Sequence, residues 1–229
     1  MKAKIFLIMR IALFGPPGVG KGTQARLLSE RRGLKHISTG VILRQAMEEG
    51  TPLGREAAAY VNDGKLVPGE LVRKLAEAAI AETGYDDFVL DGYPRTVEQA
   101  LWLNEFLEAH EAPLHAVISL QVPDDVIVDR LSKRRVDRVT GENYHLDFKP
   151  PPPDLDPDRI IQRPDDRPEA IRKRLEVYRS ETLPVEHIYE DCGKLYRVDG
   201  VGTMEEVYRR IEAILEKVSR PVETGRVRP

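Results

Sequence analysis

Residues 15–23 read Gly-Pro-Pro-Gly-Val-Gly-Lys-Gly-Thr, and this stretch decides the fold. It follows a short apolar run, residues 11–14, that is typical of a buried strand, and it precedes a run from Gln24 onward that suits a helix. Glycines let successive backbone N–H groups turn toward one concavity, and the N-terminus of a helix adds a partial positive charge. Because Lys21 could then reach the terminal phosphates of a nucleotide, we interpret the stretch as a phosphate-binding loop.

A second motif, Asp91-Gly92-Tyr93-Pro94-Arg95, follows the apolar run 88–90. An aspartate at the carboxyl end of a central strand, beside a phosphate-binding loop, is where an acid that organises Mg²⁺ belongs. Thr23 would supply a hydroxyl for the same ion, although Gly22 stands where the general motif has Ser or Thr directly after the lysine. We therefore expect Mg²⁺ at Thr23 and Asp91, bound through water. A simple turn is the alternative interpretation of this motif.

The pattern along the chain predicts an α/β fold. Short apolar runs at 11–14, 88–90 and 116–120, with a weaker one at 195–198, alternate with longer amphipathic segments. The helix-like segments lie at about 21–32, 41–49, 69–82, 96–109, 168–190 and 203–218. We expect a doubly wound parallel sheet of the P-loop NTPase type, with about five strands and with helices on both faces.

Two insertions interrupt this alternation. Residues 38–67 are predicted to form a compact helical lobe punctuated by glycines. Residues 133–166 lack helix signals and contain the consecutive prolines Pro150 to Pro153, so they form a long loop or a small β lobe. A flexible linker is the alternative for this second insertion, but arginines bracket it on both sides, which favours a lid. The core would then comprise residues 1–37, 68–132 and 167–229.

Composition and charge exclude several classes of protein. The chain has 35 Lys and Arg against 38 Asp and Glu, which gives a formal net charge of -3. Its overall charge therefore provides no electrostatic attraction for non-specific binding to nucleic acid. The apolar run 5–9 ends at Arg10 and is too short for a membrane span or a secretory signal. A single cysteine, Cys192, cannot form an internal disulfide. We expect a cytoplasmic monomer without nucleic-acid or membrane partners.

Further motifs appear in a fixed order along the chain. They are Ser38-Thr39-Gly40, Gly64-Lys65-Leu66-Val67, Gln99, Arg130, Arg134-Arg135, Tyr144-His145, Arg163-Pro164-Asp165-Asp166, Arg172-Lys173-Arg174-Leu175 and Val198-Asp199-Gly200. Together with the first two motifs they resemble the adenylate kinase family of nucleoside monophosphate kinases, over about residues 9–218. The resemblance implies reversible, Mg²⁺-dependent transfer of the terminal phosphoryl group of ATP to AMP, which gives two ADP. It makes 38–67 the monophosphate-binding lobe and 133–166 a long lid.

The same resemblance implies a role for individual residues. On the ATP side they are Gly18, Val19, Gly20, Lys21, Gly22, Thr23, Arg130 at the adenine, Arg134, Asn143, Tyr144 and the backbone near Gly202. On the AMP side they are Thr39, Arg44, Lys65, Leu66, Val67, Gly92, Tyr93, Pro94, Arg95 and Gln99, with Arg163 and Arg174 bridging toward the transferring group. The catalytic set would be Lys21, Arg95, Arg134, Arg163 and Arg174.

Elementary chemistry supports this mechanism independently. The acceptor is a phosphate oxygen that is already ionised, so the reaction needs no general base and depends on holding two polyanions in line. That requirement predicts many cations and little acid–base machinery. Two alternatives stay open: a UMP/CMP or GMP kinase, against which Thr39 and Gln99 favour AMP, and a nucleotide-binding regulatory module, which would not need the lid arginines.

Val41 departs from the family pattern, because relatives usually carry aspartate directly after Ser-Thr-Gly. That acid is thought to help order water around Mg²⁺, so we hypothesise that Mg²⁺ is organised more weakly here or that a neighbour compensates. Val41→Asp is then expected to alter turnover and its dependence on Mg²⁺ concentration, measured by titrating Mg²⁺ at fixed ATP. Unchanged values for both would contradict the hypothesis.

The lid departs from many long-lid relatives in its metal chemistry. Those relatives bind structural zinc through four cysteines, whereas residues 133–166 contain none. We therefore predict no structural zinc, a lid held by hydrogen bonds, and a packing or capping role for His145. Gly202, which replaces a lysine of some relatives, is a mild change if the backbone makes the contact. Cys192 is expected to be a small, partly buried residue.

Overall fold

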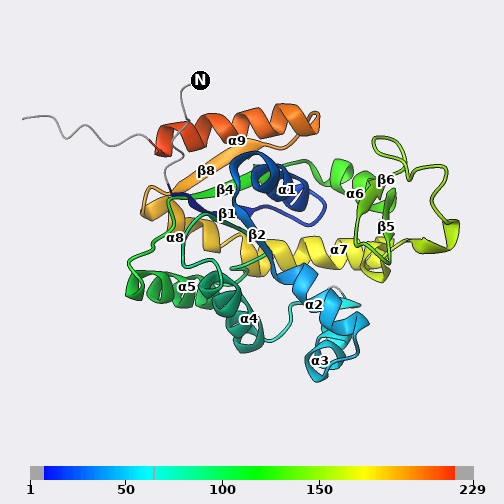
Figure 1. Ribbon diagram of the computed structural model, residues 1–229, viewed down its shortest axis with the longest axis horizontal. Helices are drawn as coiled ribbons and strands as arrows, with labels where there is room; N and C mark the ends of the chain where they lie inside the picture. The colour runs from blue at the N-terminus through cyan, green and yellow to red at the C-terminus, as the bar shows by residue number, and fades with distance from the viewer. Residues whose placement is uncertain (1–7, 64, 220–229) are drawn as a thin grey trace, which may run out of the picture.

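The computed structural model describes residues 8–63 and 65–219, so Gly64 and the terminal parts of the predicted core, 1–7 and 220–229, lie outside it. Its centre is a five-stranded parallel sheet with the strand order β2-β3-β1-β4-β8 (Figure 1). The strands are β1 (Arg10–Phe14), β2 (Lys35–Ser38), β3 (Phe88–Asp91), β4 (Ala116–Gln121) and β8 (Leu195–Asp199). The predicted α/β fold with a parallel sheet is confirmed.

Helices cover both faces of the sheet because its central strands are apolar on both sides. Ile11 and Leu13 of β1 pack with α1 (Lys21–Arg32) and α9 (Met204–Val218). Ala12 and Phe14 point to the opposite face, toward α4 (Gly69–Ala81), α5 (Val97–Ala109) and α8 (Val185–Asp191). Successive side chains of a strand alternate in direction, so a short run without polar residues specifies a strand between two helical layers.

Three elements differ from the predicted pattern, and one of them is the helix at residues 124–132, which the predicted helix-like segments do not include. β2 was not predicted, because this edge strand presents the polar residues Lys35 and His36 and has no continuous apolar run. The single helix predicted at 168–190 is divided into α7 (Pro168–Val177), a π-helical turn (Tyr178–Thr182) and α8. Pro184 has no backbone N–H to continue the helical hydrogen bonds, which is consistent with a break at this point.

The two insertions have different architectures. The first contains α2 (Thr39–Glu48) and α3 (Pro52–Val61), as the helical pattern predicts. The second follows α6 (Asp124–Ser132) and forms an antiparallel sheet of β5 (Arg134–Asp137), β6 (Asn143–His145) and β7 (Ile160–Ile161), with short 3₁₀ turns at Pro157–Arg159 and Pro164–Asp166. Figure 1 shows this small sheet projecting beyond α6, at the opposite end of the molecule from α5.

Asp137 organises the small sheet. This carboxylate is 1 % exposed, and it accepts hydrogen bonds from the Arg159 guanidinium, the Thr140 hydroxyl and the Val139 backbone N–H. The Arg159 hydrogen bond, the largest favourable contribution, holds the pKa of Asp137 well below its ordinary value. Burial of a charged group is tolerated when it is paired in this way, so hydrogen bonds tie the strands of this insertion together.

None of the helices in the part of the chain described here combines the length and the apolar character that crossing a membrane requires.

Candidate active site

The phosphate-binding loop joins the carboxyl end of β1 to the first turn of α1. Gly20 caps α1 with φ 109°, a left-handed conformation that side chains rarely adopt. A Cβ atom at Gly18 would lie 2.6 Å from Cγ of Leu131, so only glycine lets the loop pass this close to α6. The Lys21 ammonium group donates hydrogen bonds to the carbonyl oxygens of Gly15 (2.7 Å) and Pro16 (3.0 Å). The lysine thus lies across the loop that its own backbone forms.

Asp91 lies beside this loop because of the strand register. It pairs with Leu13 of β1 on one side and with Ser38 of β2 on the other. His36 Nε2 and Ser38 Oγ both lie 3.4 Å from Asp91 Oδ2. Burial alone would raise the pKa of this carboxyl group, but the His36 hydrogen bond and the Lys21 charge hold it below its ordinary value. Asp91 therefore carries a negative charge at neutral pH.

The groups near the loop fit a Mg²⁺ ion by their chemistry. Mg²⁺ prefers oxygen ligands and keeps several waters, so that one or two carboxylates and the substrate phosphates suffice. Asp91 Oδ2 would lie 3.3 Å from a Cβ atom placed on Gly22, which brings this carboxylate against the first turn of α1, where Thr23 lies. No group of three or more His, Cys, Asp or Glu residues in ranges 8–63 and 65–219 could hold a metal by itself.

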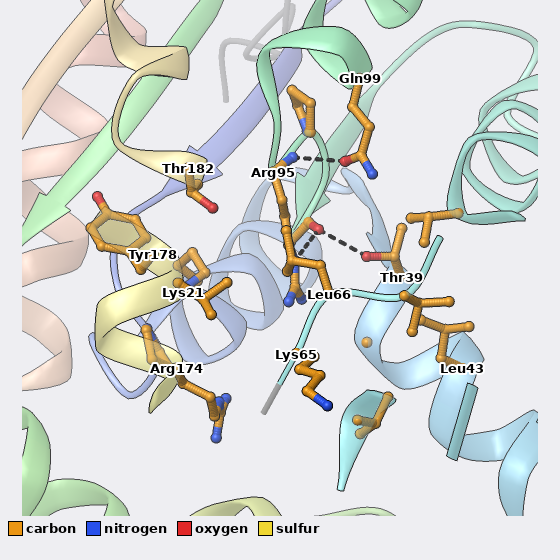
Figure 2. A pocket seen from close by; sticks show the side chains of 18 of the residues that line it. Lys21, Thr39, Leu43, Lys65, Leu66, Arg95, Gln99, Arg174, Tyr178 and Thr182 are labelled. Atoms are coloured by element: carbon orange, nitrogen blue, oxygen red, sulfur yellow. Dashed lines mark hydrogen bonds between the residues drawn. The ribbon is translucent and has the colours of Figure 1, made fainter. Parts of the chain in front are cut away.

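A pocket opens in front of the loop, between the sheet, α2 and α7 (Figure 2). We call it the central cleft. The predicted site residues that line it are Lys21, Thr39, Arg44, Lys65, Leu66, Val67, Gly92, Pro94, Arg95, Gln99 and Arg174. They come from α1, α2, α7 and the segments around α4 and α5, so the fold brings together residues that lie far apart in the sequence.

The cations of the cleft lie close enough to repel one another. Burial, followed by the charges of Arg95, Arg174 and Arg134, lowers the pKa of Lys21 to about 8 even though Asp91 opposes this shift. Burial likewise lowers the pKa of Arg44, Arg95, Arg163 and Arg174, and each of them feels at least one other guanidinium group. Such a cluster holds its positive charge at an energetic cost, which bound phosphate groups would relieve.

Two aspartates orient these cations, and the sequence interpretation assigned no role to either. Asp166 is 0 % exposed and accepts two hydrogen bonds from Arg134, at 2.7 and 2.6 Å. Arg174 Nη1 lies 3.0 Å from Asp165 Oδ2 and 3.4 Å from Asp166 Oδ1. The sequence signal that could have identified them is the pair of adjacent acids in a motif that also contains arginines. A buried carboxylate needs a partner, and the nearby arginines are the cations that can pair with it.

The part of the cleft between α2 and α5 is built around Gly92. Its carbonyl oxygen accepts hydrogen bonds from Thr39 Oγ1 (3.0 Å) and Arg95 Nε (2.7 Å). Gln99 Oε1 accepts a hydrogen bond from the Arg95 backbone N–H at 2.8 Å, so the amide nitrogen of this side chain is the end left to donate (Figure 2). Tyr93 is 1 % exposed and packs in the core, where its hydroxyl group donates to the Gln99 carbonyl oxygen at 3.4 Å.

Other predicted site residues lie outside the central cleft. Arg130 donates hydrogen bonds to the carbonyl oxygens of Val19 (3.3 Å) and Gly200 (3.2 Å). Gly202 lies two residues after Gly200, and its own φ angle is 122°. Arg163 Nη2 donates to Asn143 Oδ1 at 3.0 Å, which links the end of the second insertion to β6. The remaining ones are Gly18, Val19, Gly20, Gly22 and Thr23 in the loop, Arg134 at the start of β5, and Tyr144 in β6.

Comparison with known proteins identifies the family. The adenylate kinase family model matches residues 13–194. The chain belongs to the adenylate kinase family. It is 59% identical over 212 residues to an adenylate kinase of Salinibacter ruber, across 93% of this chain and 100% of the relative. It is 42% identical over 215 residues to an adenylate kinase of Archaeoglobus fulgidus, across 92% of this chain and 99% of the relative. The predicted ATP:AMP phosphotransferase activity is confirmed by these matches.

Two residues that the sequence analysis singled out, Val41 and Cys192, are exposed at the surface. Val41 is 51% exposed on α2 and lines a shallow surface pocket together with His36 and Ser38, the neighbours of Asp91. Cys192 is exposed at the end of α8, so the prediction that it is partly buried is wrong. The reason is that α8 ends at Asp191 and the chain turns there at the surface before it enters β8.

Proposed function

We propose that this member of the adenylate kinase family transfers the terminal phosphoryl group of Mg²⁺-ATP to AMP in the central cleft, reversibly, and that the clustered cations carry the reaction. The observation that supports this most directly is that the side chains of four cations line one cleft, namely Lys21, Arg44, Arg95 and Arg174. The same cleft contains Thr39 and Gln99, the residues that favour AMP as the acceptor. A cleft for a single neutral ligand would not need four cations.

The two nucleotides would enter from opposite sides of the loop. We assign ATP to the side of Gly18 to Thr23, where backbone N–H groups and the N-terminus of α1 receive its phosphates. Arg130 and Gly202 border the region where its adenine would lie. We assign AMP to the side of α2, where Arg44 and Arg95 would hold its phosphate and Gln99 would donate its free amide N–H to adenine. The transferring group would then lie between Lys21 and Arg174.

No side chain is required to remove a proton. The attacking phosphate oxygen of AMP is ionised, so the residues of the chain orient both nucleotides and neutralise the charge that spreads over the transferring group. Mg²⁺, held through water by Thr23 and Asp91, would add charge neutralisation at the phosphates of ATP. Each fixed cation aimed at developing charge contributes on the order of 3 kcal/mol in the transition state.

We propose that the described parts of residues 38–67 and 133–166 are the mobile parts of the enzyme and that the described parts of residues 1–37, 68–132 and 167–229 form its core. The second insertion carries Asn143 and Arg163, while Arg134 stands at its start, so closing it would deliver two arginines to the phosphates and exclude water as a competing acceptor. The hydrogen-bonded sheet around Asp137 supports a lid that needs no zinc. Since the cleft is complete within one chain, we expect a monomer to be the active species, acting in the cytoplasm, where its nucleotide substrates are found.

Acceptor specificity provides the first test of this function. With Mg²⁺-ATP as donor, we expect AMP to be phosphorylated at least about a hundredfold more efficiently, as kcat/KM, than GMP, UMP or CMP, because a buried amide that hydrogen-bonds one base is left unpaired by another. A coupled assay of ADP formation with each of the four monophosphates measures this. Equal rates with UMP or CMP would assign the chain to a different acceptor, and no turnover with any of them would indicate a binding protein.

The lowered pKa of Lys21 predicts how ATP binding depends on pH. Below about pH 8 the ammonium group is charged and ready to receive phosphate; above that pH the free protein must first take up a proton. The dissociation constant for Mg²⁺-ATP is therefore expected to rise about tenfold between pH 7.5 and 9. Calorimetric titration at the two pH values checks this. Lys21→Met should bind Mg²⁺-ATP weakly at both pH values, with no change in affinity between them. A wild-type affinity that is the same at pH 7.5 and 9 would contradict the prediction.

A further inference from the structure

Glu186 is a buried carboxylate that the proposed reaction does not use. It lies on α8 and is 2 % exposed. Ser119 of β4 donates a hydrogen bond to Oε1 at 2.6 Å, the Tyr178 hydroxyl donates to the same oxygen at 3.4 Å, and Arg197 of β8 donates to Oε2 at 3.3 Å. A buried carboxylate costs several kcal/mol unless its oxygens are paired, and here donors from three separate elements pair it. Glu186 thus connects the neighbouring strands β4 and β8 to Tyr178.

Tyr178 connects this carboxylate to the central cleft. It is the first residue of the π-helical turn and lies directly after α7, and its side chain lines the cleft beside Val177 and Arg174. Residues four apart lie on the same face of a helix, so Arg174 and Tyr178 are neighbours along that face. Figure 2 shows both side chains near Lys21, with the Tyr178 hydroxyl directed away from the middle of the cleft.

The π-helical turn Tyr178–Thr182 follows α7, and a regular α-helix is the alternative conformation for these residues. The Leu183 backbone N–H donates to the Tyr178 carbonyl oxygen at 2.8 Å, which closes the wide turn. Wide turns of this kind are rare and often lie at functional sites. Conversion of the turn to regular α-helix would shift the residues by one position, which is a rotation of about 100° around the axis. A contact that holds Tyr178 in place would therefore set how the last turn of α7 faces the cleft.

We propose that Glu186 is a positioning residue for phosphoryl transfer. It anchors the Tyr178 hydroxyl, and Tyr178 holds the last turn of α7 in the orientation that presents Arg174 to the transferring group. Asp165 and Asp166 hold the guanidinium end of Arg174, whereas the Glu186 contact fixes the backbone from which that side chain extends. The inference rests on the proposed role of Arg174 and adds a residue that never touches the nucleotides.

Tyr178→Phe tests the anchor, because it keeps the ring and its packing and removes only the hydroxyl. We expect kcat to fall about tenfold while KM for ATP and for AMP stays within about twofold, since a small displacement of an aligned cation affects the transfer step more than binding. Glu186→Leu should reproduce this loss. Glu186→Gln keeps an oxygen that accepts from Ser119 and Tyr178, and it should restore kcat to within about threefold of the wild type.

Tyr189→Phe is the matched control. Tyr189 is a buried tyrosine of α8, and its hydroxyl donates to Asn104 Oδ1 at 3.3 Å, on α5 and away from the turn after α7. Both substitutions should lower the melting temperature by a similar amount, and only Tyr178→Phe should lower kcat. An equal loss of kcat in Tyr189→Phe would show that the effect is general destabilisation, and an unchanged kcat in Tyr178→Phe would show that no anchor exists; either result overturns the proposal.

A double-mutant cycle identifies the residue through which the anchor acts. Arg174→Lys removes the forked guanidinium whose orientation the turn is proposed to control. In that background we expect Tyr178→Phe to change kcat less than twofold, because the interaction it supports is already absent. Strictly additive losses would overturn the proposal. Absence of ATP:AMP transfer in the wild type would instead overturn the proposed function itself, so the two failures are distinguishable.

Discussion

Lys21→Ala is expected to lower kcat for ADP formation by about two to three orders of magnitude. The ammonium group lies across the phosphate-binding loop, 2.7 Å from the Gly15 carbonyl oxygen, and burial together with neighbouring guanidinium groups already lowers its pKa. A cation held there at a cost in the free protein is stabilised most when phosphate charge develops beside it. The loss should therefore appear mainly in kcat, measured by the coupled assay with saturating ATP and AMP.

A surface cation on the same helix provides the control for this substitution. Arg31 lies in the last turn of α1 and pairs with Glu205 of α9, with side chains 42% and 45% exposed. Arg31→Ala removes an exposed ion pair, which solvent screens, and should leave kcat unchanged. Circular dichroism should be the same for both variants. If Lys21→Ala loses less than tenfold in kcat, the lysine is not a major source of transition-state stabilisation.

The sequence was most informative where one short segment determines both structure and chemistry. The loop at 15–23 could be placed between a strand and a helix because its glycines, lysine and flanking residues all agree with a single local conformation. The observed α1 begins at Lys21 and ends at Arg32, as the pattern predicts. Thr39 and Gln99 could be assigned to the same cleft only through the resemblance, because their proximity depends on the packing of α2 and α5 around β3.

What the sequence did not reveal depends on contacts between distant segments. β2 is defined by its pairing with β3 and not by its own hydrophobicity. The buried Glu186 is paired by Ser119, which is 67 residues away in the sequence, and no local pattern marks the π-helical turn at 178–182. Asp166 looks like one acid among many until the structure places Arg134 against it. Such partnerships have no local pattern, so periodicity and motif spacing cannot predict them.

The electrostatics of the cleft connect these observations. The fold gathers several arginines around Lys21, and the same region contains the partly buried Asp91 and the buried aspartates Asp165 and Asp166. The charges of Arg174, Arg134 and Arg44 hold the pKa of Asp165 below its ordinary value although burial alone would raise it. The aspartates thus keep the free cleft from accumulating uncompensated positive charge, and they hold the guanidinium groups in place until phosphates arrive.

Asp166→Asn is accordingly expected to lower the free energy of unfolding by about 3 kcal/mol and kcat by at least about tenfold. The substitution preserves size but leaves Arg134, which is only 20% exposed, without its buried negative partner, and it leaves Arg174 with Asp165 alone. Urea unfolding followed by circular dichroism at pH 7 measures the first effect. Asp124→Asn is the control, because Asp124 pairs with Arg179 at the surface and is 52% exposed, so its loss should cost less than about 1 kcal/mol.

Adding Arg134→Met to Asp166→Asn separates stability from catalysis. The first substitution removes the cation that the second leaves unpaired, so the double variant should recover part of the lost stability. Its kcat should fall further, because Arg134 is then missing from the transfer step. Recovery of both quantities together would show that Arg134 serves only the fold. No recovery of stability would show that Asp166 stabilises the protein through Arg174 or through its packing, and not mainly as the partner of Arg134.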